Sequence, residues 1–155
     1  MQSLHPRIDL DVTAPGAERA LGTLDDYVSR LGLDPLLVEL VRMRVSQVNG
    51  CHVRLDMHSR AARARGETEQ RRYVLDAWRE APYYTERERA ALAWAEAVTL
   101  VADGHVPDEV YDEVRQHFDE AEVAALTLAT VAINSWTRVA ISLRMLPVRE
   151  PAVAA

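Results

Sequence analysis

Cys51 is the only cysteine of the chain, and two residues that could work with a thiol follow it at helical spacing. Arg54 comes three residues later and His58 seven, so a helix beginning near Cys51 would place all three side chains on one face. Free N–H groups at a helix start and a guanidinium one turn on favour a thiolate. The spacing therefore indicates a candidate site for thiol chemistry. It also fits a cysteine that is only a small buried apolar residue, beside a histidine with a structural hydrogen bond.

A metal site is the weaker alternative for these residues. Cys51, His52 and His58 could supply ligands, with Glu39 as a fourth. On a helix, however, His52 would point about a hundred degrees away from Cys51, and the chain has no recognised zinc spacing. We therefore expect neither a metal nor another cofactor.

The elements that must position this face are helices. Asp34-Pro35 begins one of them, because a carboxylate caps free N–H groups and proline suits the first turn. Asn49-Gly50 ends it just before Cys51, since both residues tolerate left-handed backbone angles. Thr85 and Glu88 match a capping box that opens an Ala-rich helix. Apolar periodicity and breaks together predict helices over residues 17–31, 34–48, 51–66 and 68–81, then from 85 to about 103, from 107 onward, and from 120 to about 146.

No segment alternates apolar and polar residues as a half-buried strand does. The sequence thus predicts an all-α, single-domain helical bundle of six or seven helices over residues 17–147. Residues 1–16 are polar and interrupted by prolines, so they are expected to form an extended N-terminal arm, and residues 148–155 a frayed tail. Several helices carry apolar residues on more than one face, which favours a homo-oligomer. A central helix that is buried all round would explain one of them equally well.

The composition argues against several classes of function. A net charge of −6 disfavours a broad phosphate-binding surface, because nucleic-acid affinity comes from clustered cations. No apolar run approaches the roughly 20 residues that span a bilayer, and the first residues lack the features of a signal peptide. A single cysteine forms no internal disulfide, so nothing points to an oxidising compartment. We expect a cytoplasmic protein without a nucleic-acid or membrane partner.

From Leu36 to Arg89 the sequence closely resembles the alkylhydroperoxidase D-like branch of the carboxymuconolactone decarboxylase superfamily. The matching text is LLVELVRMRVSQVNGC, then DMHSRAARARGETEQR and LDAWREAPYYTERERAALAWAEAVT, with HVPDEVY and AINSWTR further on. The resemblance covers most of the chain. It implies an all-helical fold that assembles as oligomers with intertwined subunits.

The resemblance also implies site residues. Redox-active members of the family carry a C-x-x-C pair, a histidine four residues after the second cysteine, and a glutamate on the preceding helix. Cys51 matches the first cysteine, His58 the histidine, and Glu39, twelve residues before Cys51, the glutamate. Arg54 stands where the family has the second cysteine, the thiol usually assigned the attack on peroxide. No disulfide can then close within one subunit, which excludes ordinary two-cysteine cycling; a sulfenic acid on Cys51 would need an external thiol or a neighbouring subunit to resolve it.

Three kinds of function remain open at this point. The leading one is a peroxidase-like, antioxidant oxidoreductase in which Glu39 and His58 relay a proton from Cys51 while the thiol reduces a hydroperoxide. The second is a cofactor-free lyase or isomerase of the decarboxylase type, in which Arg54 binds the carboxylate of a small-molecule substrate. The third is a non-catalytic family member. Trp136, within AINSWTR, is a candidate substrate-binding residue, although core packing is the default for a buried tryptophan.

Overall fold

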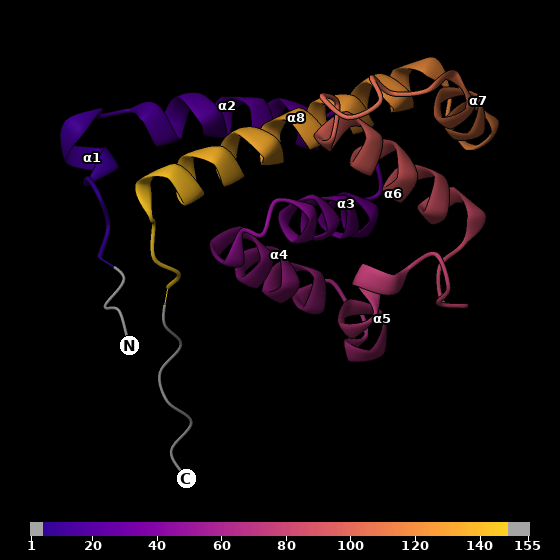
Figure 1. Cartoon of the computed structure of the whole chain (residues 1–155), viewed down its shortest axis with the longest axis horizontal. Coiled ribbons are helices and arrows are strands. Elements are labelled where there is room, and N and C mark those ends of the chain that lie inside the picture. The colour runs from indigo at the N-terminus through magenta and orange to yellow at the C-terminus, as the bar shows by residue number, and fades with distance from the viewer. Residues whose placement is uncertain (1–4, 149–155) are drawn as a thin grey trace, which may run out of the picture.

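The structure is a computed structural model that describes residues 5–148 of the 155-residue chain (Figure 1). These residues form eight α-helices and one short 3-10 helix, and contain no β-strand. The elements in chain order are α1 (Leu10–Thr13), α2 (Ala17–Ser29), α3 (Pro35–Val48), α4 (His52–Ala64), α5 (Glu69–Tyr73), η1 (Leu75–Ala77), α6 (Glu86–Thr99), α7 (Asp108–His117) and α8 (Glu120–Leu143). The predicted all-α fold class is confirmed.

The helices are arranged around α3. In Figure 1, α2 and α8 lie side by side along the upper edge of the molecule, and α3 and α4 lie below them. α6 and α7 lie toward the right-hand end of the view. α3 packs against α4, α6 and α8, and α4 also contacts α8. The predicted site residues on α3 and α4 therefore lie on two neighbouring helices, with α2 and α8 alongside.

α3 is the helix that is buried nearly all round, and it lies between two clusters of apolar side chains. The first cluster, shared with α6, α7 and α8, includes Leu37, Val41, Trp94, Phe118, Leu126 and Ile133. The second, shared with α4, η1 and α6, includes Leu40, Met43, Ala62, Leu75, Trp78 and Leu92. Each large side chain buried in this way contributes about 1.5–3 kcal/mol. A polar residue on α3 is thus held by packing on both sides.

Local sequence chemistry determines where two central helices begin. Asp34 Oδ1 accepts hydrogen bonds from the backbone N–H groups of Leu36 (2.7 Å) and Leu37 (3.0 Å), with Pro35 in the first turn of α3. At the start of α6, the side chains of Thr85 and Glu88 form the predicted capping box. Both starts are where the sequence predicts them, because the capping groups lie within three residues of the helix.

Two helices end earlier in the structure than the sequence predicts. The helix expected over 68–81 ends at Tyr73, and a 3-10 turn follows, because Leu75 is fully buried and the Trp78 indole donates a hydrogen bond to Glu96 Oε1 (2.8 Å). The last helix ends at Leu143 rather than near residue 146. Arg144 there adopts a left-handed conformation (φ 54°) that turns the chain away.

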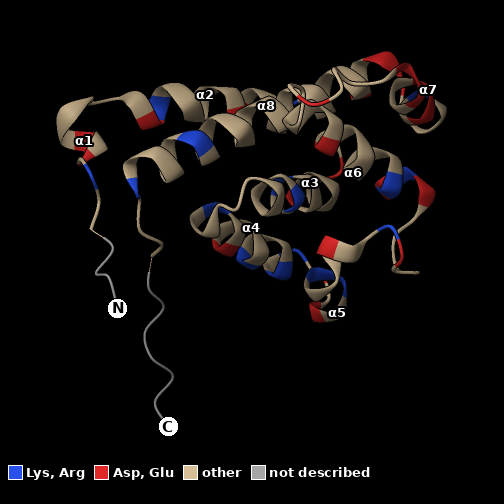
Figure 2. Cartoon of the chain, in the orientation of Figure 1, with Lys and Arg blue, Asp and Glu red and all other residues tan. Residues whose placement is uncertain are grey.

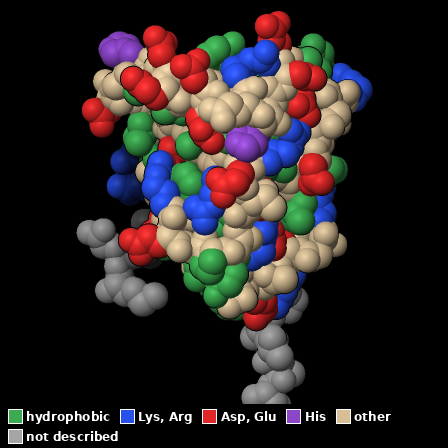
Figure 3. Space-filling model, turned by 90° about the vertical axis from the view of Figure 1, so that its right-hand side faces the viewer, with side chains coloured by type: hydrophobic (Ala, Val, Ile, Leu, Met, Phe, Trp, Pro, Cys, Tyr) green, Lys and Arg blue, Asp and Glu red, His purple; other side chains and the backbone are tan. Residues whose placement is uncertain are grey.

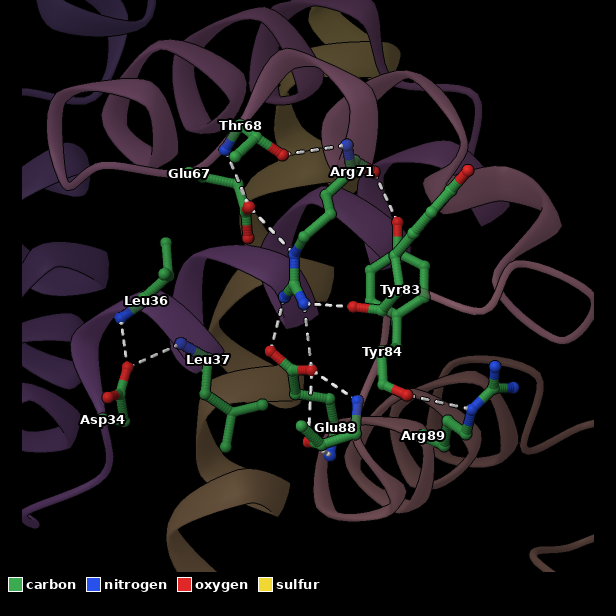
Figure 4. A network of polar contacts seen from close by, with 11 residues as sticks. Asp34, Leu36, Leu37, Glu67, Thr68, Arg71, Tyr83, Tyr84, Glu88 and Arg89 are labelled. Carbon is green, nitrogen blue, oxygen red and sulfur yellow. Dashed lines mark hydrogen bonds and ion pairs between the residues drawn. The ribbon is translucent and has the colours of Figure 1, made fainter.

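A polar network fixes the segment between α5 and α6 (Figure 4). The Arg71 guanidinium donates to Glu67 Oε1 (2.9 Å) and to both carboxylate oxygens of Glu88, and it also contacts the Tyr83 carbonyl. The Tyr84 hydroxyl donates to the Arg71 carbonyl, and burial raises the pKa of Tyr84 to about 12. This cluster joins two segments that the sequence predicts only as separate helices.

The N-terminal arm, as far as it is described, docks on the end of α8. The Arg7 backbone N–H donates to the Leu143 carbonyl (2.8 Å), and the Arg7 side chain donates to the Ser142 carbonyl (2.9 Å). The predicted extended arm includes one helical turn, α1, because Asp9 caps it by accepting from the Val12 N–H. This turn raises the number of α-helices above the predicted six or seven. Residues 1–4 of the arm and 149–155 of the tail lie outside the described residues.

The surface mixes charges of both signs. On the face shown in Figure 3, acidic and basic side chains are interspersed with apolar ones. α8 has few charged residues (Figure 2), and by length and composition alone it would be long and apolar enough to cross a membrane. This differs from the expectation from sequence, because Arg138 interrupts the apolar run of α8 without ending the helix. Half of its apolar window is buried within the fold, which is typical of a core helix of a soluble domain.

Candidate active site

The turn before α4 places Cys51. The Asn49 side chain donates hydrogen bonds to Asn134 Oδ1 (2.9 Å) and Thr137 Oγ1 (3.1 Å), which tie the turn to α8. Gly50 then adopts a positive φ of 66°, a conformation that costs glycine little. Cys51 follows as the N-cap residue of α4 rather than within its first turn, and its side chain makes no capping hydrogen bond.

The thiol of Cys51 is buried but borders a pocket. The residue is 2% exposed, and the pocket has a volume of about 240 Å³ between the start of α4 and the end of α8. Its walls are mainly apolar and include Val53, Ala140, Ile141, Met145 and Leu146, with His52 and Arg144 beside them. Cys51 is therefore one of the residues that line a mostly apolar pocket.

Glu39 and His58 form a close buried pair between α3 and α4. Glu39 Oε2 lies 2.8 Å from His58 Nδ1, and the two side chains are 4% and 9% exposed. Because an ionised carboxylate only accepts hydrogen bonds, Nδ1 carries the hydrogen, and Nε2 of a neutral ring has its lone pair free. The pair can thus hold an imidazole base in a fixed orientation.

Glu39 is ionised in this setting. Burial raises its pKa, but the hydrogen bond with His58 and the nearby cations outweigh burial, so the pKa of Glu39 lies below its ordinary value of 4.5. Arg42 Nη1 lies 3.4 Å and Arg65 Nη1 3.8 Å from Glu39 Oε1. Glu39, Arg42 and Arg65 also line a second pocket of about 140 Å³ between α2 and α3.

No hydrogen bond of the described residues supports the relay that the sequence predicts from the thiol to this pair. Within residues 5–148, no hydrogen bond joins the Cys51 sulfur to His58 or to Glu39. The two pockets also share no lining residue. The structure therefore brings together Glu39 and His58 but leaves Cys51 on the α8 side of the site.

Sequence reasoning missed Asp25 and Arg42, which connect the pair to α8. Arg42 Nη2 donates to Asp25 Oδ1 (2.9 Å), and the Trp136 indole N–H donates to Asp25 Oδ2 (2.5 Å). A continuous series of polar contacts therefore runs from Trp136 through Asp25 and Arg42 to Glu39. Arg42 could have been found from its position three residues after Glu39, whereas Asp25 gives no local signal.

Arg54 lies over Trp136. The guanidinium carbon is 4.1 Å from the centroid of the indole ring, and the residue is 9% exposed. Its Nε atom is buried without a hydrogen-bond partner in the described part of the chain, and no carboxylate there forms an ion pair with it. Burial lowers the pKa of Arg54, and negative charge on Cys51, Glu18 and Asp25 opposes this effect. Arginine nevertheless keeps its charge, so the site contains a fixed cation near the thiol.

The structure gives no support to the metal alternative. Among the described residues, no group of three or more His, Cys, Asp or Glu side chains is arranged to hold a metal ion. His58 is instead bound to Glu39, and Cys51 lies at the other pocket.

Comparisons with known proteins extend the resemblance. The pattern of the carboxymuconolactone decarboxylase family matches residues 15–97. The uncharacterized protein YdfG of Bacillus subtilis is 40% identical over 140 residues, which cover 90% of this chain and 95% of YdfG. A crystal structure from Agrobacterium tumefaciens, described as a protein of unknown function and as a "putative antioxidant defence protein AhpD", has a TM-score of 0.91 at 38% identity; the match covers 94% of this chain and 100% of that one. A peroxidase-related AhpD-core protein from Ralstonia eutropha has a TM-score of 0.77 at 20% identity over 88% of this chain and 73% of its own, and so shows a shared fold.

Proposed function

The chain belongs to the carboxymuconolactone decarboxylase family, and we propose that it is an AhpD-like oxidoreductase that works with one thiol, Cys51. The observation that carries the proposal is the position of Cys51. Cys51 is the N-cap residue of α4, lines the pocket of about 240 Å³, and lies near enough to Arg54 for their charges to interact. A helix start and a neighbouring cation both stabilise a thiolate, the nucleophilic form of cysteine.

The reaction has two stages. The Cys51 thiolate attacks the terminal oxygen of a hydroperoxide, the O–O bond breaks, and the products are a sulfenic acid on Cys51 and an alkoxide that takes one proton to leave as the alcohol. An external thiol then displaces water from the sulfenic acid and forms a mixed disulfide. A second external thiol attacks this mixed disulfide, restores the Cys51 thiol and leaves with the first as their disulfide. Arg54 cannot replace the external thiol, because a guanidinium transfers no electrons.

Glu39 and His58 act on oxygen rather than on sulfur in this proposal. Among the described residues no hydrogen bond joins the imidazole to the Cys51 sulfur, and none involves its Nε2. We assign His58 the protonation of the leaving alkoxide: the ring first takes up a proton from water at Nε2 and then donates it to the alkoxide, while Glu39 orients the ring through Nδ1. This changes the relay expected from sequence, in which the pair takes the proton of the thiol.

One observation favours a second function, a cofactor-free lyase or isomerase. Arg54 is nine-tenths buried with an unpaired Nε, and the Glu39–His58 pair can move a proton without any thiol. A substrate carboxylate on Arg54 would then be held while His58 removes a proton from carbon. This chemistry would not need Cys51, which separates the two functions experimentally.

The test is the reactivity of Cys51 toward peroxide. The reduced protein is treated with one equivalent of cumene hydroperoxide, and sulfenic acid is trapped with dimedone and located by mass spectrometry. We expect oxidation at Cys51 to be about 100-fold faster than in the urea-unfolded protein, since positioned acid–base groups contribute about 10²–10⁴-fold. In a parallel sample without dimedone, glutathione should remove the sulfenic acid. His58→Gln should slow oxidation, and equal rates in the folded and unfolded protein would disprove the proposal.

The compartment and the oligomeric state of the protein are inferred from its reductant and from its surface. We propose a cytoplasmic homo-oligomer, because external thiols are abundant in that compartment and α8 leaves large apolar side chains exposed. Val131 is 42% and Ile141 47% exposed on α8. Light scattering of the purified protein should give a multiple of 17.4 kDa, and Val131→Glu should shift it toward that mass. A monomer at micromolar concentration would contradict the proposed assembly.

A further inference from the structure

We propose that the pocket beside Cys51 takes an anionic low-molecular-weight thiol, and that Arg144 is the residue that selects this thiol by its charge. The inference rests on the proposed function and deepens it, because that function requires an external thiol without specifying its chemical class. In the step concerned, the thiolate of the reductant forms an S–S bond with the Cys51 sulfur, and the S–O bond of the sulfenic acid breaks. The released hydroxide takes a proton from the solvent and leaves as water.

The first argument is the sign of the charge around the pocket. Among the described residues that line this pocket of about 240 Å³ none is acidic, and Arg144 is the one arginine or lysine. The chain as a whole carries a net charge of −6, so a cationic lining differs from the average of the molecule. Arg54, whose charge interacts with that of Cys51, adds a second cation near the sulfur. The pocket therefore attracts an anion toward Cys51 and repels a cation.

The second argument is that the Arg144 charge has no partner in the part of the chain that the structure describes. The residue is exposed, and its side chain forms neither a hydrogen bond nor an ion pair with another described residue. Arg42 and Arg71, by contrast, each form ion pairs with two carboxylates. A cation that the fold does not neutralise is available to attract a ligand.

Acidic side chains line the neighbouring pocket instead, which is formed with the N-terminal arm. That pocket shares Met145 and Leu146 with the pocket beside Cys51, and its lining includes Asp11 and Glu18. Neither of these two acidic residues lines the pocket beside Cys51. The charges nearest to a ligand beside the sulfur are therefore those of cations.

The third argument is that the backbone holds Arg144 at the pocket. Arg144 is the C-cap residue of α8, its N–H donates to the carbonyls of Ala140 and Ile141, and its φ of 54° is left-handed. Glycine is the residue that most often ends a helix in this conformation, so backbone preference does not explain an arginine here. The side chain is thus attached at a fixed point of the pocket lining.

The size of the pocket indicates a small thiol. A volume of about 240 Å³ lies just below the range of about 300–1,000 Å³ that is usual for small-molecule sites. A short thiol that carries a carboxylate or sulfonate fits such a space, whereas a folded protein domain does not enter it. The structure therefore favours a free anionic thiol over a protein thiol as the reductant of Cys51.

The first experiment tests charge selection without peroxide. Cys51 is the only cysteine, so mass spectrometry of the intact protein follows its alkylation by iodoacetate, an anion, and by iodoacetamide, the neutral analogue. Arg144→Gln removes the charge, Arg144→Lys keeps it, and Arg144→Gly removes it while it relaxes the left-handed backbone. Arg63→Gln is the matched control, because the Arg63 side chain is 63% exposed, loses the same charge and does not line the pocket. Circular dichroism verifies that each variant is folded.

The second experiment compares reductants of different charge. Cys51 is converted to the sulfenic acid with one equivalent of cumene hydroperoxide, and its reduction is followed by mass spectrometry. The reductants are 2-mercaptoethanesulfonate, 2-mercaptoethanol and cysteamine, which carry a negative charge, no charge and a positive charge beside the thiol. Each rate is expressed as the ratio of wild type to variant, so that the intrinsic reactivity of the thiol cancels. Both experiments are carried out at about 20 mM and about 500 mM salt, because salt screens exposed charges.

At low salt we expect iodoacetate and mercaptoethanesulfonate to react about threefold more slowly with Arg144→Gln and Arg144→Gly than with wild type, in line with the modest effect of one exposed charge. Arg144→Lys and Arg63→Gln should stay close to wild type. The neutral reagents should be unaffected, and cysteamine should react faster with Arg144→Gln than with wild type. High salt should remove these differences.

Two results would separate this inference from the proposed function. An equal slowing in Arg63→Gln, equal ratios for the three thiols, or failure of both reagents to alkylate the folded protein would overturn the selection by Arg144. Alkylation that depends on Arg144, in a protein whose Cys51 forms no sulfenic acid, would overturn the peroxide reduction alone.

Discussion

Replacing Glu39 by glutamine isolates the charge at the centre of the site. The side chain is 4% exposed, and glutamine has nearly the same shape and keeps an oxygen that can accept from His58 Nδ1. The substitution therefore removes the ionic part of the contact and leaves the packing of α3 almost unchanged. It also leaves Arg42 with Asp25 as its remaining acidic partner.

The expected loss of stability follows from the contacts that lose their charge. A hydrogen bond to an ionised group contributes about 1.5–3 kcal/mol and a neutral one about 0.5–1.5, so the 2.8 Å bond to His58 loses about 1 kcal/mol. Weaker attraction to Arg42 (3.4 Å) and to the half-exposed Arg65 (3.8 Å) adds about 1 kcal/mol in all. We expect a total of about 2 kcal/mol, equivalent to a lowering of Tm by about 4–8 °C for a domain of this size.

The stability difference between wild type and Glu39→Gln should decrease as the pH is lowered. The pKa of Glu39 is lower in the folded chain than its ordinary value of 4.5, so the unfolded chain binds more protons near that pH. The stability that the carboxylate provides is therefore fully present above about pH 5.5 and is lost as the pH falls through the folded pKa. The difference between wild type and Glu39→Gln should be constant from about pH 6 to 8 and should shrink below about pH 4.5.

Urea unfolding at fixed protein concentration, carried out at pH 7 and pH 4, measures this difference. Glu69→Gln is the matched control, because Glu69 pairs with Arg63 and Arg72 at the surface and is 51% exposed. That change should cost less than about 0.5 kcal/mol. Equal stability of wild type and Glu39→Gln at pH 7, or a difference that persists unchanged at pH 4, would refute the claim that Glu39 is a paired carboxylate.

Other substitutions test the surrounding contacts. Trp136→Phe keeps a ring for Arg54 but removes the hydrogen bond to Asp25, so it should cost about 1–3 kcal/mol in urea unfolding, and a neutral result would mean that the indole N–H is not bonded. Thr85→Ala removes the cap of α6 and should cost about 1 kcal/mol in thermal unfolding, while Thr85→Ser should cost little. Arg54→Cys introduces a second thiol three residues after Cys51 and should give peroxide turnover with dithiothreitol. An internal disulfide should then be visible by mass spectrometry. Its absence would contradict the match of positions 51 and 54 to the two cysteines of the C-x-x-C pair.

Sequence predicts the helices whose ends are decided locally. The starts at Asp34 and Thr85 depend on groups within three residues of the helix, and both are found as predicted. The break inside residues 68–81 could not be predicted in this way. It depends on Leu75 being buried and on Trp78 donating to Glu96, 18 residues further along the chain. Tertiary packing of these residues overrides a locally favourable helix.

The same distinction applies to the site. Glu39 and His58 lie on successive helices separated by one short turn, so their spacing and the family resemblance were enough to predict that they meet. Asp25 could not be predicted from the sequence, because its contact with Trp136 spans 111 residues and depends on α2 lying beside α8. The catalytic roles of Glu39, Cys51 and His58, and the substrate-binding roles of Arg54 and Trp136, remain predictions that the proposed experiments address.

The position of Arg54 restricts what chemistry the site can perform. A guanidinium accepts neither electrons nor, at neutral pH, protons, so reactivity has to come from the thiol or from the Glu39–His58 pair. These two groups line separate pockets, of about 240 Å³ on the α8 side and about 140 Å³ on the α2 side. A hydroperoxide must reach Cys51 at the first pocket and takes only a proton from His58, whereas a lyase substrate reacts at His58 itself. Cys51→Ser therefore distinguishes the two functions: an oxidoreductase loses all turnover, and a lyase keeps its ability to exchange a carbon-bound proton with solvent.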